Sequence, residues 1–190
     1  WFGDAVSYLT QWYGLNFASL DANGDIWSAW WAPGLASWRI DNLSTITGAP
    51  PLVGGLTAYL TDWGGINLAG LDAQGEVRGT WWVPQFDDEW QSNNLSQGLG
   101  HPGLVGDPTS YVTPWGGTNL AGVDANGDLV VYWWAPGLQD WVVSPLSALV
   151  PGAVLPITSV EGLTSPSGLI SLFGFTDGET PVRYNWQPGG

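Results

Sequence analysis

Short runs of apolar and β-branched residues alternate along the whole chain with clusters of Gly, Asn, Asp and Pro. This pattern is typical of β-strands joined by tight turns, because Gly and Asn readily adopt the positive φ that such turns require. One stretch divides into four such strands, which are Tyr59–Trp63, Ile66–Leu71, Glu76–Trp82 and Trp90–Leu95. We therefore predict an antiparallel meander that contains no helix longer than about two turns.

The same unit recurs along the chain at offsets of 51 and 52 residues. Each copy carries Tyr-x-Thr-x-Trp, then Asn, Asp-Ala-x-Gly, Trp-Trp-x-Pro, a single Trp and Leu-Ser, and a fourth copy is degenerate. A period of this length indicates a repeat architecture. We predict one repeat domain over residues 1–190, with copies at approximately 5–52, 56–104, 108–156 and 160–190.

Adjacent tryptophans constrain how the sheets pack. Neighbouring residues of a strand point to opposite faces, so both members of a Trp-Trp pair are buried only if the sheet is covered on both sides. We expect both members of each pair to face opposite sides of their sheet and to be mostly buried; the pairs are Trp30–Trp31, Trp81–Trp82 and Trp133–Trp134. The predicted fold is all-β: a small β-propeller of about four blades, each a four-stranded antiparallel sheet.

The last blade is incomplete, because copy four ends without the strand that follows the single Trp in the other copies. Three explanations stay open: the natural chain is longer, the last blade has three strands, or another copy of the chain completes it. The third explanation predicts self-association through the last blade.

The Trp-Gly-Gly motif, the Asp-Ala-Asn-Gly hairpin, the Trp-Trp pair and the single Trp resemble a bacterial propeller family that includes fucose-binding lectins. The resemblance covers copies one to three, whereas Ser167 occupies the first Trp position in copy four. It implies an extracellular or cell-surface protein that recognises sugars, fucose-like ones among them, in pockets between neighbouring blades.

Composition narrows the class of partner. The chain has 17 acidic residues, three arginines and no lysine, which gives a formal charge of −14. Nucleic acid and anionic membranes are excluded as partners, because both require a basic surface. Membrane insertion is not expected either, since the apolar stretch Ala148–Val160 is interrupted by two prolines. Cysteine is absent, so disulfides and thiolate metal sites are excluded.

The repeated acidic hairpin admits two readings. Asp21, Asn23 and Asp25 present oxygens at alternate positions, as do Asp124, Asn126 and Asp128, and such oxygens would suit calcium. Asp and Asn-Gly in a short hairpin are also explained by turn geometry alone, and we favour this structural role. We predict no metal site and no cofactor. The acidic cluster Asp87-Asp88-Glu89 is interpreted as a solvated loop.

An enzymatic role is not supported by the sequence. His101 is the only histidine, has no apparent nucleophilic partner and is expected to be a solvent-exposed loop residue. A glycosidase needs paired carboxylates at one place, whereas this chain spreads its repeated residues evenly over the copies. A sialidase needs several arginines at its site, but Arg39, Arg78 and Arg183 lie at non-equivalent positions. We predict no catalytic residues.

Candidate ligand-binding residues lie where the first two strands of each copy meet. Tryptophan stacks on the apolar face of a sugar, and a nearby amide can bond its hydroxyl groups. Each tryptophan could equally serve packing, and each asparagine could cap a turn. The leading hypothesis is a non-catalytic, secreted or cell-surface module that binds neutral glycans weakly and multivalently; the alternative is a structural or adhesive repeat of a longer extracellular protein or filament, without a small ligand. The candidates are Trp12, Trp63, Trp115, Asn16, Asn67 and Asn119.

Overall fold

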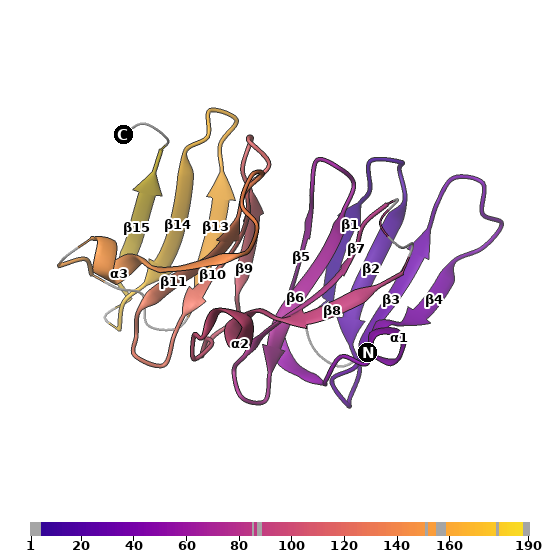
Figure 1. The fold of residues 1–190 in the computed structure, drawn as a ribbon, viewed down its shortest axis with the longest axis horizontal. Coiled ribbons are helices and arrows are strands. Elements are labelled where there is room, and N and C mark those ends of the chain that lie inside the picture. Colours follow the sequence, from indigo (N-terminus) through magenta and orange to yellow (C-terminus); the bar gives the residue numbers. More distant parts are fainter. Residues whose placement is uncertain are drawn as a thin grey trace. The chain divides into compact units, whose positions relative to one another are not determined.

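The computed structural model describes residues 5–84, 86, 89–150, 152–154, 159–177 and 179–187. These residues form four antiparallel sheets, three of four strands and one of three, and every sheet comes from a single copy of the repeat (Figure 1). The chain divides into two compact units, Trp1–Asn94 and Leu95–Gly190, and each unit holds two sheets. The prediction of a meander repeated along the chain is thus confirmed.

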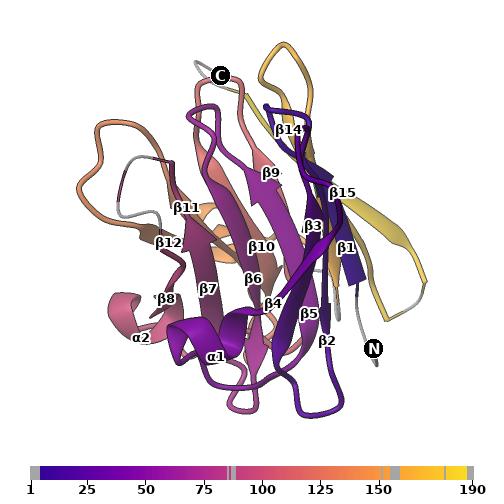
Figure 2. The same ribbon diagram turned by 90° about the vertical axis from the view of Figure 1, so that its right-hand side faces the viewer.

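The first unit contains sheets 1 and 2 (Figure 2). Sheet 1 comprises β1 (Ala5–Leu9), β2 (Leu15–Leu20), β3 (Ile26–Trp31) and β4 (Arg39–Asn42). Sheet 2 comprises β5 (Leu52–Leu60), β6 (Ile66–Asp72), β7 (Val77–Trp82) and β8 (Gln91–Asn94).

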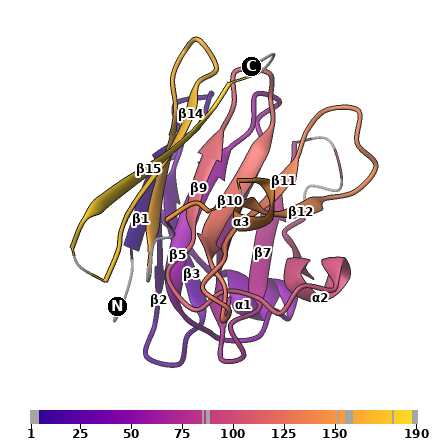
Figure 3. The same ribbon diagram turned by 90° about the vertical axis from the view of Figure 1, so that its left-hand side faces the viewer.

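The second unit contains sheets 3 and 4 (Figure 3), and the first strands of these two sheets are in contact. Sheet 3 comprises β9 (Thr109–Val112), β10 (Thr118–Val123), β11 (Leu129–Trp134) and β12 (Val142–Pro145). Sheet 4 comprises β13 (Val160–Thr164), β14 (Ile170–Phe175) and β15 (Pro181–Trp186).

Strand register repeats with the sequence. Tyr8 pairs with Asn16 in sheet 1, and the corresponding residues pair in sheets 2 and 3. β5 begins at Leu52, before the predicted first strand of the second copy, which starts at Tyr59, and it contains register shifts around Gly54. The reason is that the Leu52 N–H donates to the Gly24 carbonyl and the Leu52 side chain is buried.

Three short helices follow the outer strands. They begin at the Leu-Ser motif, to which the predicted fourth strand extended. They are α1 (Leu43–Thr47), α2 (Leu95–Leu99) and α3 (Leu146–Leu149). In α1 the Asn42 side chain accepts a hydrogen bond from the Thr45 N–H at 2.8 Å, and Gly48 ends the helix at a φ of 69°. An N-cap followed by a left-handed glycine favours a helix over a strand. No helix among the described residues is long and apolar enough to cross a membrane.

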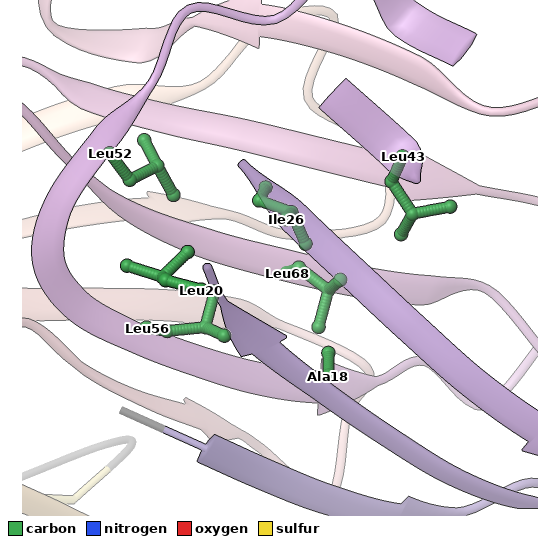
Figure 4. Close-up of a cluster of buried hydrophobic side chains, with 7 residues drawn as sticks. All are labelled: Ala18, Leu20, Ile26, Leu43, Leu52, Leu56 and Leu68. Atoms are coloured by element: carbon green, nitrogen blue, oxygen red, sulfur yellow. The ribbon is translucent and has the colours of Figure 1, made fainter. Parts of the chain in front are cut away.

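Aliphatic side chains, rather than the paired tryptophans, form the core between sheets 1 and 2. Figure 4 shows the cluster of Ala18, Leu20, Ile26, Leu43, Leu52, Leu56 and Leu68, all of them buried. Trp90, the single Trp of the second copy, packs against this cluster from outside. A corresponding cluster in the second unit is built around Tyr111, Ala121, Val123 and Leu172. The two sheets of each unit therefore pack face to face through apolar side chains.

Candidate functional site

The turn joining the first two strands has the same construction in sheets 1 to 3. The hydroxyl of a buried threonine accepts a hydrogen bond at 2.8 Å from the N–H of the glycine four residues later. In sheet 4, Ser165 accepts from the Leu169 N–H at 3.0 Å. This bond closes a tight loop whose backbone donor would otherwise be unpaired. The pairs are Thr10–Gly14, Thr61–Gly65 and Thr113–Gly117.

Trp12, Trp63 and Trp115, three predicted site residues, lie on these turns. Their exposed fractions are 39%, 43% and 40%. The indole folds back over its own turn, since a Cβ placed on Gly117 would lie 3.1 Å from Nε1 of Trp115. Each ring is therefore held in place by its turn while part of it stays accessible.

Two of these tryptophans also contact the next sheet of their unit. Trp12 meets Trp82 edge to face with ring centroids 5.8 Å apart, and Trp115 meets Trp186 in the same way at 5.8 Å. The Gln11 side chain strengthens the first contact by donating to the Asp62 carbonyl at 2.7 Å. The turn tryptophan is therefore a packing residue as well as a surface residue.

The predicted asparagines lie beneath the turns. Asn16 Nδ2 donates to the Gly14 carbonyl at 3.0 Å, and Asn119 Nδ2 donates to the Gly117 carbonyl at 3.3 Å. The corresponding Nδ2 of Asn67 is buried and has no hydrogen-bond partner among the described residues. The first two contacts support the turn-capping alternative. Hydrogen bonding from these residues to a sugar remains a prediction.

A groove of about 680 Å³ lies between sheets 3 and 4, and it brings together Trp115 and Asn119 from the predicted set. Its walls are mostly apolar. Leu149 and Val154 follow β12 along one side, and the Tyr184 hydroxyl donates to the Val154 carbonyl. Ser144 adds a hydroxyl group, and the other aromatic side chains that line the groove are Tyr111, Trp133, Trp134, Tyr184 and Trp186.

The paired tryptophans are mostly covered, as predicted, but none of the six is fully buried. The members of each pair are adjacent in a strand and point to opposite faces. The physical reason for the incomplete burial is that each pair ends its strand, and in the first and third copies the indole N–H groups bond to polar atoms at the periphery. Trp133 donates to Ser144 Oγ at 3.0 Å, and Trp134 donates to the Leu138 carbonyl at 3.1 Å. A Trp pair thus borders the groove instead of filling the core.

The acidic hairpin has the structural role that we favoured. Asp21 Oδ1 accepts from the N–H groups of Asn23 and Asp25 at 2.8 and 3.0 Å, and Oδ2 accepts from Trp27 Nε1. Desolvation opposes ionisation, but these hydrogen bonds outweigh it and lower the pKa of Asp21. No group of three or more His, Asp or Glu side chains among the described residues is placed to hold a metal ion.

The corresponding carboxylates of the next two copies have other partners. Asp72 is buried and accepts from Arg78 Nε at 2.7 Å; desolvation raises its pKa, but the Arg78 contact and two backbone N–H groups lower it overall. Asp124 Oδ2 lies 3.8 Å from His101 Nε2. The predicted loop residues Asp87 and Asp88 lie outside the described residues.

The prediction that His101 is solvent-exposed is wrong. Its side chain is 13% exposed, and Nδ1 lies 2.8 Å from the Tyr132 hydroxyl, which in turn lies 3.1 Å from Ser96 Oγ. Desolvation lowers the pKa of His101 more than the charges of Asp124 and Asp128 raise it. In sequence, residue 130 is Val where the first two copies have Trp27 and Arg78, so Asp124 lacks a partner at that position.

No protein-family model matches the chain, and no curated protein sequence matches it. Several solved structures do. AofleA from Arthrobotrys oligospora is 19% identical with a TM-score of 0.71 over 98% of this chain, which spans 54% of that protein. A fucose lectin from Kordia zhangzhouensis, solved with methyl-fucoside, is 19% identical with a TM-score of 0.51 over 74% of this chain and 97% of its own length.

The N224Q mutant of the Aleuria aurantia lectin, a lectin described as a six-bladed β-propeller, was solved with Fucα1-6GlcNAc. It is 16% identical with a TM-score of 0.57 over 97% of this chain and 58% of its own. The chain thus spans about half the length of several solved structures that it matches. Its sheets correspond to propeller blades, and in fold the chain matches the fucose-specific β-propeller lectins.

Proposed function

We propose that the chain is a non-catalytic carbohydrate-binding module that takes neutral glycans in the groove between sheets 3 and 4. The observation that carries this proposal is the pair of half-exposed indoles, Trp115 and Trp186, at one groove. An aromatic face is the surface on which the apolar side of a sugar ring stacks.

Polar groups for the sugar hydroxyls are present in the same groove. Ser144 Oγ accepts from Trp133 and keeps its own hydrogen to donate, and Asn119 lies beneath the turn. Strand β15 pairs on one side only within the described part of sheet 4, so its other side offers backbone N–H and C=O groups. These groups suit an uncharged ligand.

Charge favours a neutral sugar over an anionic one. The chain carries a net charge of −14. The one cationic residue at the groove, Arg183, has its guanidinium carbon 5.2 Å from the centroid of the Phe173 ring and donates to Ser171. A sialic acid or uronic acid would therefore meet repulsion without a free counter-charge in the described groove. Fucose-like sugars are the first candidates, because two of the matched lectins were solved with fucosides.

Binding at one groove is expected to be weak, and several weak sites would act together. The Trp12–Trp82 contact repeats the aromatic arrangement in the first unit. A shallow site makes few contacts with a monosaccharide, so a Kd of about 0.1–10 mM is expected. Avidity would then come from multivalent glycans. Such a role fits a secreted or cell-surface protein, which is the location we propose.

Calorimetric titration with methyl α-fucoside and a panel of other neutral glycosides tests the proposal. The parent chain is expected to bind at least one of them, and Trp186→Ala is expected to weaken binding at the groove at least tenfold. The matched control is Trp38→Ala, because Trp38 is 45% exposed, lies in the first unit and does not line this groove. It should leave binding to the second unit unchanged.

Circular dichroism would verify that both variants keep the fold. Absence of a response to every glycoside at about 50 mM would refute the proposal, since that concentration exceeds the expected Kd several-fold. Equal weakening by Trp186→Ala and Trp38→Ala would show that the groove is not the binding site.

A further inference from the structure

One face of sheet 1 is apolar and uncovered. Leu15 and Phe17 of β2 alternate along this face and are 45% and 49% exposed. Phe17 pairs with Ala29, and Ala29 pairs with Ile40 of β4, so these side chains form a row across the sheet. Leu9 and Ile40 are exposed as well. A sheet face with so many large apolar side chains in water is typical of an interaction surface.

The equivalent face of sheet 2 shows what normally covers it. Ile66 and Leu68 correspond to Leu15 and Phe17, yet they are only 6% and 1% exposed. Leu68 is buried against Ala18 and Leu20, which belong to the opposite face of sheet 1. In this repeat, therefore, one face of a sheet is covered by the opposite face of the preceding sheet.

In sheet 4 the uncovered face is the other one, which corresponds to the Ala18 and Leu20 face of sheet 1. Phe173 and Phe175 of β14 are 37% and 60% exposed, and Leu163 of β13 is also exposed. The equivalent residues of sheet 3, Ala121 and Val123, are 0% and 1% exposed. They are buried together with Leu172 of sheet 4 in the core of the second unit. Within its own unit, each of sheets 1 and 4 thus has one face that the partner sheet does not cover, and the two faces are of the two kinds that pack together inside the units.

We propose that copies of this chain associate head to tail, with the outer face of sheet 4 of one copy packing on the outer face of sheet 1 of the next. The occupant of each face is a second copy of the chain because this chain supplies both members of the complementary pair. Such an interface is heterologous, so it generates closed rings or open filaments.

Charge does not oppose this contact, despite the net charge of the chain. The sheet 1 face is formed by apolar and hydroxyl side chains, such as Ser7, Leu15 and Phe17. On the sheet 4 face, Arg183 lies over Phe173, and Glu161 accepts a hydrogen bond from Thr109. Burying these two faces removes apolar area from water, while Arg183 and Glu161 each keep a hydrogen-bond partner at the junction.

Sedimentation velocity over protein concentrations from about 1 μM to 1 mM, without sugar, tests the proposal. The parent chain is expected to exceed its monomer mass of 20.3 kDa as concentration rises. Phe17→Asp and Phe175→Asp each block one face and should each stay monomeric alone. The matched control is Val53→Asp, since Val53 is 68% exposed and belongs to neither face; it should assemble like the parent.

Mixing the two blocked variants gives the decisive result. Phe17→Asp keeps the sheet 4 face and Phe175→Asp keeps the sheet 1 face, so an equimolar mixture should form a dimer of twice the monomer mass and nothing larger. A parent that stays monomeric at 1 mM overturns the proposal. So does assembly that persists in either variant, or a mixture that remains monomeric.

Discussion

Trp12 and Trp82 lie edge to face across two neighbouring sheets, with an angle of 70° between their ring planes. Trp115 and Trp186 repeat this contact in the second unit at 63°. Each pair joins a turn tryptophan to the second member of a Trp pair, or its equivalent, in the next copy. The turn tryptophan of the repeat therefore lies on the surface of its own turn and also packs against the next sheet.

Replacing Trp82 with Ala should lower the free energy of unfolding by about 2–3 kcal/mol, less than for a fully buried Trp because the ring is only partly covered. Trp82→Phe keeps an aromatic edge and should restore part of the loss. Urea unfolding followed by far-ultraviolet circular dichroism measures both values. If Trp82→Ala unfolded at the same urea concentration as the parent, the contact would have no stabilising role.

Tyr13 occupies a left-handed backbone position, with a φ of 62°, where the other three copies have Gly64, Gly116 and Gly168. The left-handed conformation costs an L-residue about 1–2 kcal/mol, and the Tyr13 ring is 73% exposed, so it contributes little packing. Tyr13→Gly should therefore raise the thermal midpoint slightly. Tyr13→Ala is the control and should not, because alanine carries the same backbone cost.

Alanine substitutions at Gly168 and Gly137 distinguish the cost of backbone strain from the cost of a steric clash. Both have positive φ, of 85° and 100°, but a Cβ on Gly168 would lie 2.9 Å from Trp115 whereas one on Gly137 would meet nothing within 4 Å. Gly137→Ala should cost about 1 kcal/mol and Gly168→Ala clearly more, because Trp115 must also move. Equal losses in denaturant unfolding would contradict the close packing of Trp115 on Gly168.

Substitutions at Thr113 test whether the hydroxyl that closes the turn stabilises the fold. Thr113→Val removes the acceptor for the Gly117 N–H and should cost about 1–3 kcal/mol, because a buried donor is left unpaired. Thr113→Ser should retain most of the stability, since Ser165 makes the same bond in sheet 4. Thermal unfolding of both variants provides the comparison, and a valine variant as stable as the serine variant would exclude this role for the hydroxyl.

His101 should make stability depend on pH near neutrality. Its pKa is lowered in the folded chain, so between the folded and unfolded pKa values the unfolded state binds more protons. The free energy of unfolding should therefore be highest above about pH 7 and fall as pH decreases through 6.5 and below. His101→Gln should lose this part of the slope between pH 7.5 and 5.5 in urea titrations. An unchanged slope in the variant would assign the dependence to other groups.

The repeat spacing was sufficient to predict the four sheets and their strands, because turn residues and apolar runs recur at fixed positions. It could not show how far each side chain is covered, since coverage depends on the neighbouring sheet. Trp81 and Trp82 illustrate this limit: alternation predicts their opposite directions, but not that they lie at the periphery.

Two local errors have different origins. The α1 helix had a readable signal in Asn42 and Gly48, which the strand pattern concealed. His101 had none, because its contact with Tyr132 joins residues 31 positions apart. The residues of the candidate site also differ in how far the sequence could predict them. Trp115 and Asn119 belong to the repeated motifs, whereas Trp186 comes from the degenerate copy, and only the fold shows that it lines the groove.

Repeats that share a sequence pattern are prone to pair with the wrong copy during folding, because each strand has several similar partners. The acidic hairpins provide a means of distinguishing them. Asp21 bonds an indole, Asp72 a guanidinium, and Asp124 lies beside an imidazole, and each of these partners is specific to one copy. A hairpin that formed with a strand of another copy would lose its own partner. Because the three carboxylates have different side-chain partners, correct pairing within a copy is favoured over pairing between copies, which helps the chain assemble its sheets in sequence order.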